Sequence, residues 1–276
     1  MKKRNPFQFK HFIIHQENVA LPVTTDACIF ASFISQKIKE YPQNETILDL
    51  GMGTGVLMFF VNQILPNSKI LGIEKDPSSF NTACKNISEN NIQNLSILNN
   101  DFFDWGKSSE QLFDIILSNP PFFENQLESI NPHKRQARHF SQNGFSDFFQ
   151  LINSKLSNHG NAWIMLPYIP NNKIEAEAEL DENILHWSSF GIKNNLTVCS
   201  FVTVQATEFK KPHVVFIHLK KTGSNDTSSS QSTNEFPSNI QTNQLIVYQK
   251  YRQYTKECFD LLNPFYNFGI FGVENL

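Results

Sequence analysis

The residues with the clearest chemical meaning are Asn119, Pro120, Pro121 and Phe122, which directly follow the apolar run 113–118. A buried strand is expected over that run, and neither two prolines nor a following aromatic helps a strand to form. The same residues suit a site that holds a planar group with an exocyclic amine. Asn119 can accept a hydrogen bond from the amine, the Pro-Pro backbone can present a fixed carbonyl, and Phe122 can stack on the ring. A plain turn at a strand end is the alternative.

A glycine loop follows another expected strand, over residues 46–50. Gly51, Gly53 and Gly55 form a Gly-x-Gly-x-Gly pattern, and a helical pattern begins at Val56. Glycines let a ligand lie directly against the backbone. Dinucleotide-binding proteins carry Gly-x-Gly-x-x-Gly instead, and Val56 stands where the final glycine of that pattern would be.

Three acids at successive strand ends indicate which ligand this loop serves. Asp49 comes just before the loop, where it would repel a pyrophosphate but can hold an ammonium group, directly or through water. Glu74 ends the next strand and suits two ribose hydroxyls. Asp101 suits an exocyclic adenine amine, and the backbone N–H of Phe102 can donate to a ring nitrogen. Asp101 alone could be a helix cap. The glycine loop and the three acids together, however, match S-adenosylmethionine, a cation with ribose and adenine and no phosphate.

The order of expected elements places these residues along one edge of a sheet. Strands are expected over 46–50, 69–74, 95–98, 113–118 and 161–167, alternating with helical patterns, and an antiparallel hairpin over 196–205 and 213–219. The fold class is therefore α/β, with a single doubly wound, seven-stranded, mostly parallel sheet and antiparallel strands at one edge. Open sheets of this kind bind ligands at the carboxyl ends of their strands.

We expect one domain over residues 1–276. Residues 1–23 read as an aromatic N-terminal arm with a short strand or hairpin. Residues 222–244 are rich in Ser, Thr and Asn and lack Lys and Arg, which predicts a mobile insertion, with a short strand over 245–248 after it.

Composition excludes several classes of protein. No apolar run is long enough to span a bilayer, and the basic start lacks the apolar region of a signal peptide. The four cysteines are scattered without metal-ligand spacing, so no metal site is expected. With a net charge of -3, any nucleic-acid contact must come from local patches. We expect a cytoplasmic, monomeric protein that is not bound to a membrane.

The motifs resemble those of the class I S-adenosylmethionine-dependent methyltransferases, which have a Rossmann-like fold and an Asn-Pro-Pro-Tyr/Phe box. More narrowly, the chain is similar to the bacterial tRNA1(Val) (adenine(37)-N6)-methyltransferases, which modify the adenine beside the anticodon. The likeness rests on the central motifs and on Phe9–Phe12, His15-Gln16, Thr25-Asp26, Gln136-Ala137-Arg138 and Tyr254–Tyr266. The chain departs from the pattern at Cys28, at Met52, at Phe122 in place of Tyr, and in its long 222–244 segment.

The resemblance implies S-adenosylmethionine as cofactor and a tRNA, valine tRNA, as partner. It adds Thr25 and Asp26 to the expected cofactor-binding residues, and we include Lys75, which follows Glu74. An adenine N6 would displace the methyl group in line, with Asn119 and the Pro120 carbonyl accepting its N–H hydrogens. For RNA contact we expect Lys134, Arg135 and Arg138, directly after the acceptor box. The basic clusters 2–4 and 210–211 are explained equally well as solvated surface.

Three alternatives are open at this stage. The same box serves release-factor glutamine N5-methyltransferases, which carry a helical N-terminal domain that the aromatic arm here does not resemble. Methylation of rRNA guanine or DNA adenine is a further option, although no segment looks like a DNA-reading domain. A non-catalytic binder of S-adenosylmethionine or RNA would not need the Asn119 box.

Overall fold

A computed structural model describes residues 5–19, 21–120, 142–169, 176–222, 240–249 and 253–268. The strands are β1 (Phe7–Gln8), β2 (Ile13–Ile14), β3 (Thr46–Leu50), β4 (Lys69–Glu74), β5 (Leu95–Asn99), β6 (Phe113–Ser118), β7 (Leu156–Pro167), β8 (Leu196–Gln205), β9 (Val214–Lys221) and β10 (Gln241–Ile246). The helices are α1 (Thr25–Ile38), α2 (Val56–Ile64), α3 (Pro77–Glu89), α4 (Phe102–Ser108), α6 (Gln142–Lys155), α7 (Ala176–Lys193) and α8 (Lys256–Leu262).

The main sheet confirms the α/β class predicted from the sequence. Its strand order is β10-β8-β9-β7-β6-β3-β4-β5, and β9 is antiparallel to both of its neighbours while the other pairs are parallel. The predicted hairpin is the β8–β9 pair. The order reverses between β3 and β6, which is where doubly wound sheets bind their ligands.

Among the described residues the sheet has eight strands, so the expected count of seven is wrong. The eighth strand, β10, is parallel to β8 at the outer edge, and its last two residues overlap the short strand expected over 245–248. Residues 241–244, which composition assigned to the insertion, form its first part, and they are exposed and polar. An edge strand of this kind is held by backbone hydrogen bonds to its neighbour and leaves little apolar pattern in the sequence. The rest of the expected insertion, residues 223–239, lies outside the described residues.

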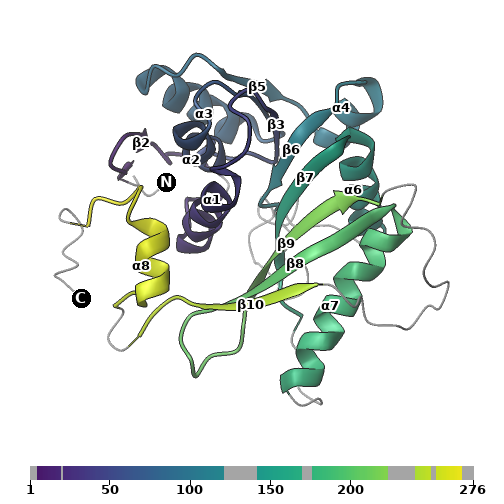
Figure 1. Ribbon diagram of the computed structural model, residues 1–276. Helices are drawn as coiled ribbons and strands as arrows, with labels where there is room; N and C mark the ends of the chain where they lie inside the picture. The colour runs from purple at the N-terminus through teal and green to yellow at the C-terminus, as the bar shows by residue number, and fades with distance from the viewer. Residues whose placement is uncertain are drawn as a thin grey trace.

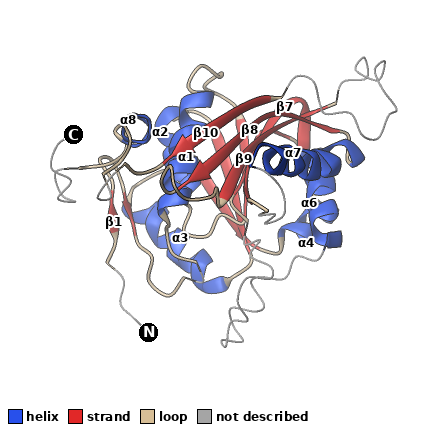
Figure 2. Cartoon of the chain, turned by 90° about the horizontal axis from the view of Figure 1, so that it is seen from below, coloured by secondary structure: helices blue, strands red, loops and turns tan. Residues whose placement is uncertain are grey.

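Helices cover both faces of the sheet and enclose two apolar cores (Figures 1 and 2). The first core contains buried residues of α1, α2, α3, α8 and the N-terminal arm, and the second contains buried residues of α4, α6 and α7. Both faces of the central strands β3 and β6 are therefore buried, which explains their nearly continuous apolar sequences.

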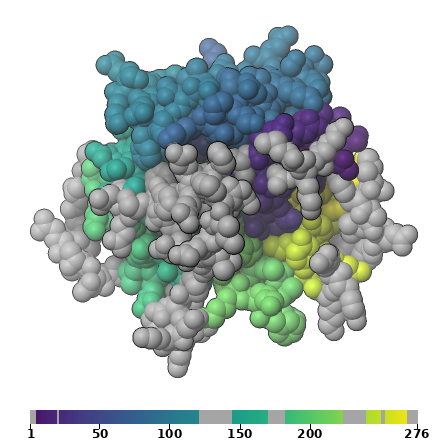
Figure 3. All heavy atoms as spheres, turned by 180° about the vertical axis from the view of Figure 1, so that it is seen from behind, coloured from purple at the N-terminus to yellow at the C-terminus, as the bar shows by residue number. Residues whose placement is uncertain are grey.

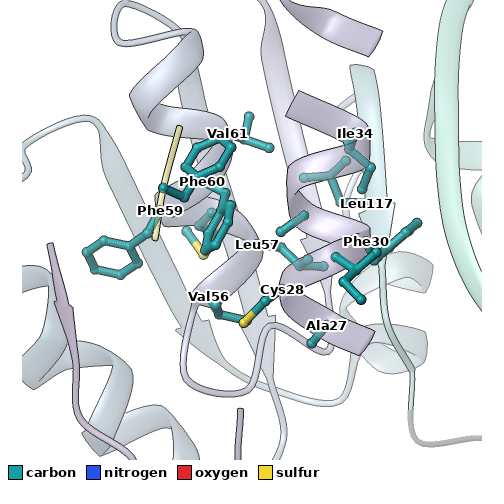
Figure 4. Packing of buried hydrophobic residues seen from close by; sticks show 14 of the residues in the cluster. Ala27, Cys28, Phe30, Ile34, Val56, Leu57, Phe59, Phe60, Val61 and Leu117 are labelled. Carbon is teal, nitrogen blue, oxygen red and sulfur yellow. The ribbon is translucent and has the colours of Figure 1, made fainter. Parts of the chain in front are cut away.

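Helices α1 and α2 pack side by side on the first face (Figure 4). Phe30 and Ile34 of α1 and Leu57 of α2 belong to one apolar cluster. The side chains of Cys28 and Val56 lie at the same end of the helix pair (Figure 4). The first turns of the two helices are thus close together, and the first turn of α2 directly follows the glycine loop.

The N-terminal arm forms the predicted hairpin. Strands β1 and β2 pair antiparallel, with Phe7 opposite Ile14. Phe9 and Phe12 pack against Phe60 of α2, with ring centroids 5.0 Å and 5.4 Å away. The arm therefore covers the outer side of the helix that begins at the glycine loop.

Candidate functional site

The carboxyl ends of β6, β3, β4 and β5 lie next to one another in the sheet. Asp49 is in register with Leu117 of β6 on one side and with Gly72 of β4 on the other. Because neighbouring strands are about 4.8 Å apart, this edge gathers four of the sequence-predicted residues. They are Asn119 beyond β6, Asp49 in β3, Glu74 at the end of β4, and Asp101 beyond β5.

Asp49 is the most unusual group at this edge. Its side chain is 0% exposed, and neither carboxylate oxygen has a hydrogen-bond partner among the described residues. Burial, followed by the charge of Glu74, raises the pKa of Asp49 to about 8. Such a group is costly unless a donor or cation reaches it. The Asp49 carboxylate, with Glu74 nearby, fits a ligand that brings an ammonium group, as S-adenosylmethionine does.

The glycine loop has the backbone that its residues predict. Gly51, Gly53 and Gly55 have φ angles of 75°, 57° and 85°, a region that other residues rarely adopt. A Cβ built at position 53 would meet nothing within 4 Å. Open space therefore lies over the centre of the loop, where a ligand can contact the backbone.

Met52 departs from the usual small residue inside such loops, and Gly72 explains how it fits. Met52 is buried, and a Cβ at position 72 would collide with its thioether sulfur. The missing side chain in β4 therefore leaves the space that Met52 fills. This pair keeps the bulky residue on the sheet and away from the open side of the loop.

Glu74 links the end of β4 to the glycine loop. One carboxylate oxygen accepts from the backbone N–H of Gly53 at 2.9 Å, and the other accepts from the N–H of Asp76 at 2.7 Å. Burial raises the pKa of Glu74, and these two N–H groups partly offset that effect. Each oxygen retains acceptor capacity that a ribose hydroxyl can use.

Asp101 is the N-cap residue of α4, a short helix that has no clear pattern in the sequence. One oxygen caps the helix by accepting from the N–H of Phe103 at 2.8 Å, and the other pairs with Nζ of Lys75 at 2.9 Å. Burial raises the pKa of Asp101, but Lys75 and the Phe103 amide outweigh it and lower the pKa overall. Asp101 is thus both a cap and a charged acceptor, and the structure brings Lys75 to Asp101. A Cβ built at position 51 would lie 3.9 Å from the ring of Phe102, the first residue of α4. Phe102 therefore lies next to the glycine loop.

Thr25 and Asp26 form the first turn of α1 after the cap residue Thr24. Asp26 pairs with Nε2 of His213 at 3.0 Å. This hydrogen bond raises the pKa of His213 although burial opposes it. His213 precedes β9 and has no recognisable signal in the sequence.

The acceptor box is described in part. Asn119 is partly exposed and Pro120 is buried. Ser118, just before the box, donates to the backbone oxygen of Leu50 at 2.7 Å and fixes the end of β6 against that of β3. The expected residues Pro121, Phe122, Lys134, Arg135 and Arg138 lie outside the described residues.

Asn86 of α3 is a positioning residue that the sequence did not reveal. It is fully buried, and its amide nitrogen donates to the backbone oxygens of His15 and Thr54, at 3.1 Å and 3.0 Å. Its oxygen accepts from the N–H of His15 at 2.7 Å. One side chain therefore joins the N-terminal arm to the glycine loop.

A cavity of about 250 Å³ lies between the arm and α3. Its lining consists of His15, Glu17, Asn18, Ser78, Asn81, Thr82 and Lys85. None of the four strand-end residues contributes to it, so the candidate site rests on the strand ends and on the unpartnered Asp49. Across the described ranges, no three His, Cys, Asp or Glu side chains gather as a metal site. No helix in those ranges is long and apolar enough to cross a membrane.

Known proteins match this chain over most of its length. The family model for the methyltransferase small domain matches residues 28–186, more than half of the chain. A protein of Pedobacter heparinus named tRNA1(Val) (adenine(37)-N6)-methyltransferase is 31% identical, covering 59% of this chain and 68% of that protein. A protein of Haemophilus influenzae with the same name is 27% identical, covering 94% and 97%. The crystal structure of a predicted O-methyltransferase from Agrobacterium tumefaciens matches the fold with a TM-score of 0.56 and 12% identity, covering 86% of this chain and 94% of that one.

Proposed function

This chain belongs to the methyltransferase small domain family, and we propose that it transfers the methyl group of S-adenosylmethionine to the N6 atom of an adenine in tRNA. The names of the relatives support valine tRNA as the substrate and adenine 37 as the target. The observation that carries the proposal is the buried, unpartnered carboxylate of Asp49, one strand away from Asn119. This arrangement supports a cation-binding site beside an amine-binding site.

The cofactor half of the site is assigned to residues at three strand ends. Asp49 would hold the ammonium group, Glu74 the ribose hydroxyls, and Asp101 with the Phe102 backbone the adenine ring. The backbone of the 51–55 loop would lie along the ligand between them. When bound, S-adenosylmethionine supplies an electrophilic methyl group on a positively charged sulfur.

The acceptor half of the site is assigned to the box that follows β6. The lone pair of an adenine amine is delocalised into its ring, which makes the nitrogen a poor nucleophile. Asn119 and the Pro120 carbonyl would accept both N–H hydrogens and stabilise the positive charge that develops on the nitrogen during transfer. The target base must leave its stack to enter such a site, and Phe122 would stack on it there.

Lys134, Arg135 and Arg138 would contact RNA phosphates next to the acceptor box. Binding through phosphates releases counterions, so tRNA affinity should fall steeply as the salt concentration rises. This dependence on salt should become weaker when the three residues are replaced by Ala. We also propose that the protein is a monomer. Its proposed tRNA substrate supports a location in the cytoplasm.

Nucleoside mass spectrometry of tRNA, from cells with and without this protein, tests the proposed function. Loss of N6-methyladenosine from one tRNA supports it. An unchanged tRNA profile together with a changed glutamine methylation in a release factor would contradict it.

A further inference from the structure

The turn between β8 and β9, residues 206–212, carries an aromatic side chain with no packing role. Phe209 is 84% exposed, more than the other large apolar side chains identified as exposed among the described residues. It belongs to neither apolar core. Lys210 and Lys211 follow it and are also exposed. A single exposed phenylalanine is ordinary on a protein surface, but here the ring stands beside two exposed cations, the combination that single-stranded nucleic acid binds.

The backbone of this turn is held in a defined shape. The N–H of Lys210 donates to the backbone oxygen of Thr207 at 3.0 Å, and the N–H of His213 donates to that of Val204 at 3.0 Å. The N–H of Tyr248, in the segment after β10, donates to the oxygen of Ala206 at 2.9 Å. These three hydrogen bonds fix the backbone conformation of the turn that carries Phe209.

The turn lies at the same edge of the sheet as the candidate site. It begins at the carboxyl end of β8 and leads into β9, which is separated from β6 by β7 alone. Two strand spacings, roughly 10 Å, thus separate the start of β9 from the strand that ends beside Asn119. The Asp26–His213 pair joins the end of the turn to the first turn of α1. Figure 3 shows the light green segment that contains this turn projecting from the surface, next to the yellow C-terminal part of the chain.

We infer that this turn is a tRNA contact, in which Phe209 stacks on a base near the target adenine and Lys210 and Lys211 contact the adjacent phosphates. The inference rests on the proposed function for its choice of nucleic acid. Every base offers a face for stacking on an aromatic ring, and a neighbouring pair of cations supplies the phosphate contact. Glu208 opposes one of these charges, so stacking carries more of the contact than charge does. When the target base leaves its stack, the faces of the adjacent bases are exposed, and an aromatic ring can stack on them.

The test measures the affinity of the full chain for an unmodified valine tRNA transcript, separately from methyl transfer. Phe209→Ala should weaken tRNA binding about tenfold, a typical loss for one stacked base, and leave S-adenosylmethionine affinity unchanged. Ile192→Ala is the matched control, because Ile192 is 68% exposed on α7 and away from this turn. Phe209→Trp should retain affinity, and its indole fluorescence should change when tRNA is added.

The two lysines are tested by the salt dependence of the same affinity. Replacing Lys210 and Lys211 by Ala should reduce the slope of log affinity against log salt by about one to two. Replacing Lys39 and Lys69 by Ala, at the opposite edge of the sheet, should leave the slope unchanged. Unaltered tRNA affinity of Phe209→Ala, within twofold of the wild type, overturns the inference. Tight tRNA binding by the wild type without methylation would overturn the proposed function alone.

Discussion

Replacing Asp49 by Asn should stabilise the cofactor-free protein and weaken its binding of S-adenosylmethionine. Burial, together with the charge of Glu74, raises the pKa of Asp49 from its ordinary value of 3.8 to about 8. Each pKa unit corresponds to about 1.36 kcal/mol, so the ionised carboxylate destabilises the free protein by on the order of 5 kcal/mol above pH 8. A buried asparagine without partners costs roughly 1–3 kcal/mol itself. The net gain at pH 8 is therefore about 2–4 kcal/mol.

The sign of this effect depends on pH. A carboxyl group whose pKa is raised by folding contributes its full stability below pH 4, where it is protonated in both states, and this contribution is lost as pH rises toward 8. The effect of Asp49→Asn on stability should thus change from a loss of about 1–3 kcal/mol near pH 4 to a gain at pH 8, and stay constant above it. Unfolding by urea at several pH values, without cofactor, measures it.

Cofactor binding should change in the opposite direction. A hydrogen bond to a charged group contributes about 1.5–3 kcal/mol, so Asp49→Asn should weaken S-adenosylmethionine binding by roughly 10- to 100-fold. Near pH 7 the wild type should release close to one proton on binding, because Asp49 must ionise to meet the ammonium group. Isothermal titration calorimetry in buffers of different ionisation enthalpy measures both quantities, and the variant should release none.

Asp114 provides a matched control at the amino end of β6. Burial raises its pKa, but Thr46 donates to it from its backbone and its hydroxyl, at 3.0 Å and 2.7 Å, and the pKa is lowered overall. Asp114→Asn should therefore destabilise the protein and leave cofactor affinity intact. The reasoning is refuted if Asp49→Asn binds the cofactor as tightly as the wild type, or if it is less stable than the wild type at pH 8.

Three further predictions follow from individual contacts. Asn86→Ala should lower the free energy of unfolding by about 1–3 kcal/mol. It should raise the KM for S-adenosylmethionine more than it lowers kcat, and hydrogen exchange should become faster in both the arm and the glycine loop. Gly53→Ala should cost about 1 kcal/mol through its positive φ, while Gly53→Asn should cost less stability; both should weaken cofactor binding, because each side chain enters the open space over the loop. Burial, and then the charges of Lys220 and Lys37, lower the pKa of His218 to about 4. The stability of the protein should therefore fall as pH drops from 6.5 through 4. His218→Gln should remove part of that fall in acid unfolding curves.

Each of these predictions has an outcome that contradicts it. Exchange that accelerates in the arm but leaves the glycine loop unchanged would show that Asn86 does not connect the two. Normal cofactor affinity in both Gly53 variants would mean that the ligand does not pass over the loop. An unchanged acid limb in His218→Gln would show that this histidine, stacked on Trp163 at 4.0 Å, does not titrate in the folded state as expected.

The sequence predicts those parts of the site that depend on short, local patterns. Strand, glycine loop and helix follow one another directly in the chain, so the positive φ angles at Gly51, Gly53 and Gly55 could be anticipated. The positions of Glu74 and Asp101 follow from the same alternation of strands and helices. Parallel strands then bring the separate strand ends to one edge without further information.

The parts that the sequence does not predict depend on distant contacts. Asn86 looks like a polar residue on the solvated side of a helix, but its partners His15 and Thr54 are 71 and 32 residues away. His213 meets Asp26 across 187 residues. The strand expected over 245–248 covers only the last two residues of β10, because residues 241–244 are polar and exposed and pair with β8 through the backbone. The roles of Phe122 and of the 134–138 cluster stay predictions, since both lie outside the described residues.

Methyl transfer by the Asn119→Ala variant tests the central claim most directly. Purified wild type and variant are incubated with unmodified valine tRNA and saturating S-adenosylmethionine, and N6-methyladenosine is quantified by mass spectrometry. The wild type should form it at one adenine, and the variant should lose turnover by at least about 100-fold while binding the cofactor normally. Near-normal turnover in Asn119→Ala would contradict the assignment of this strand end as the acceptor site.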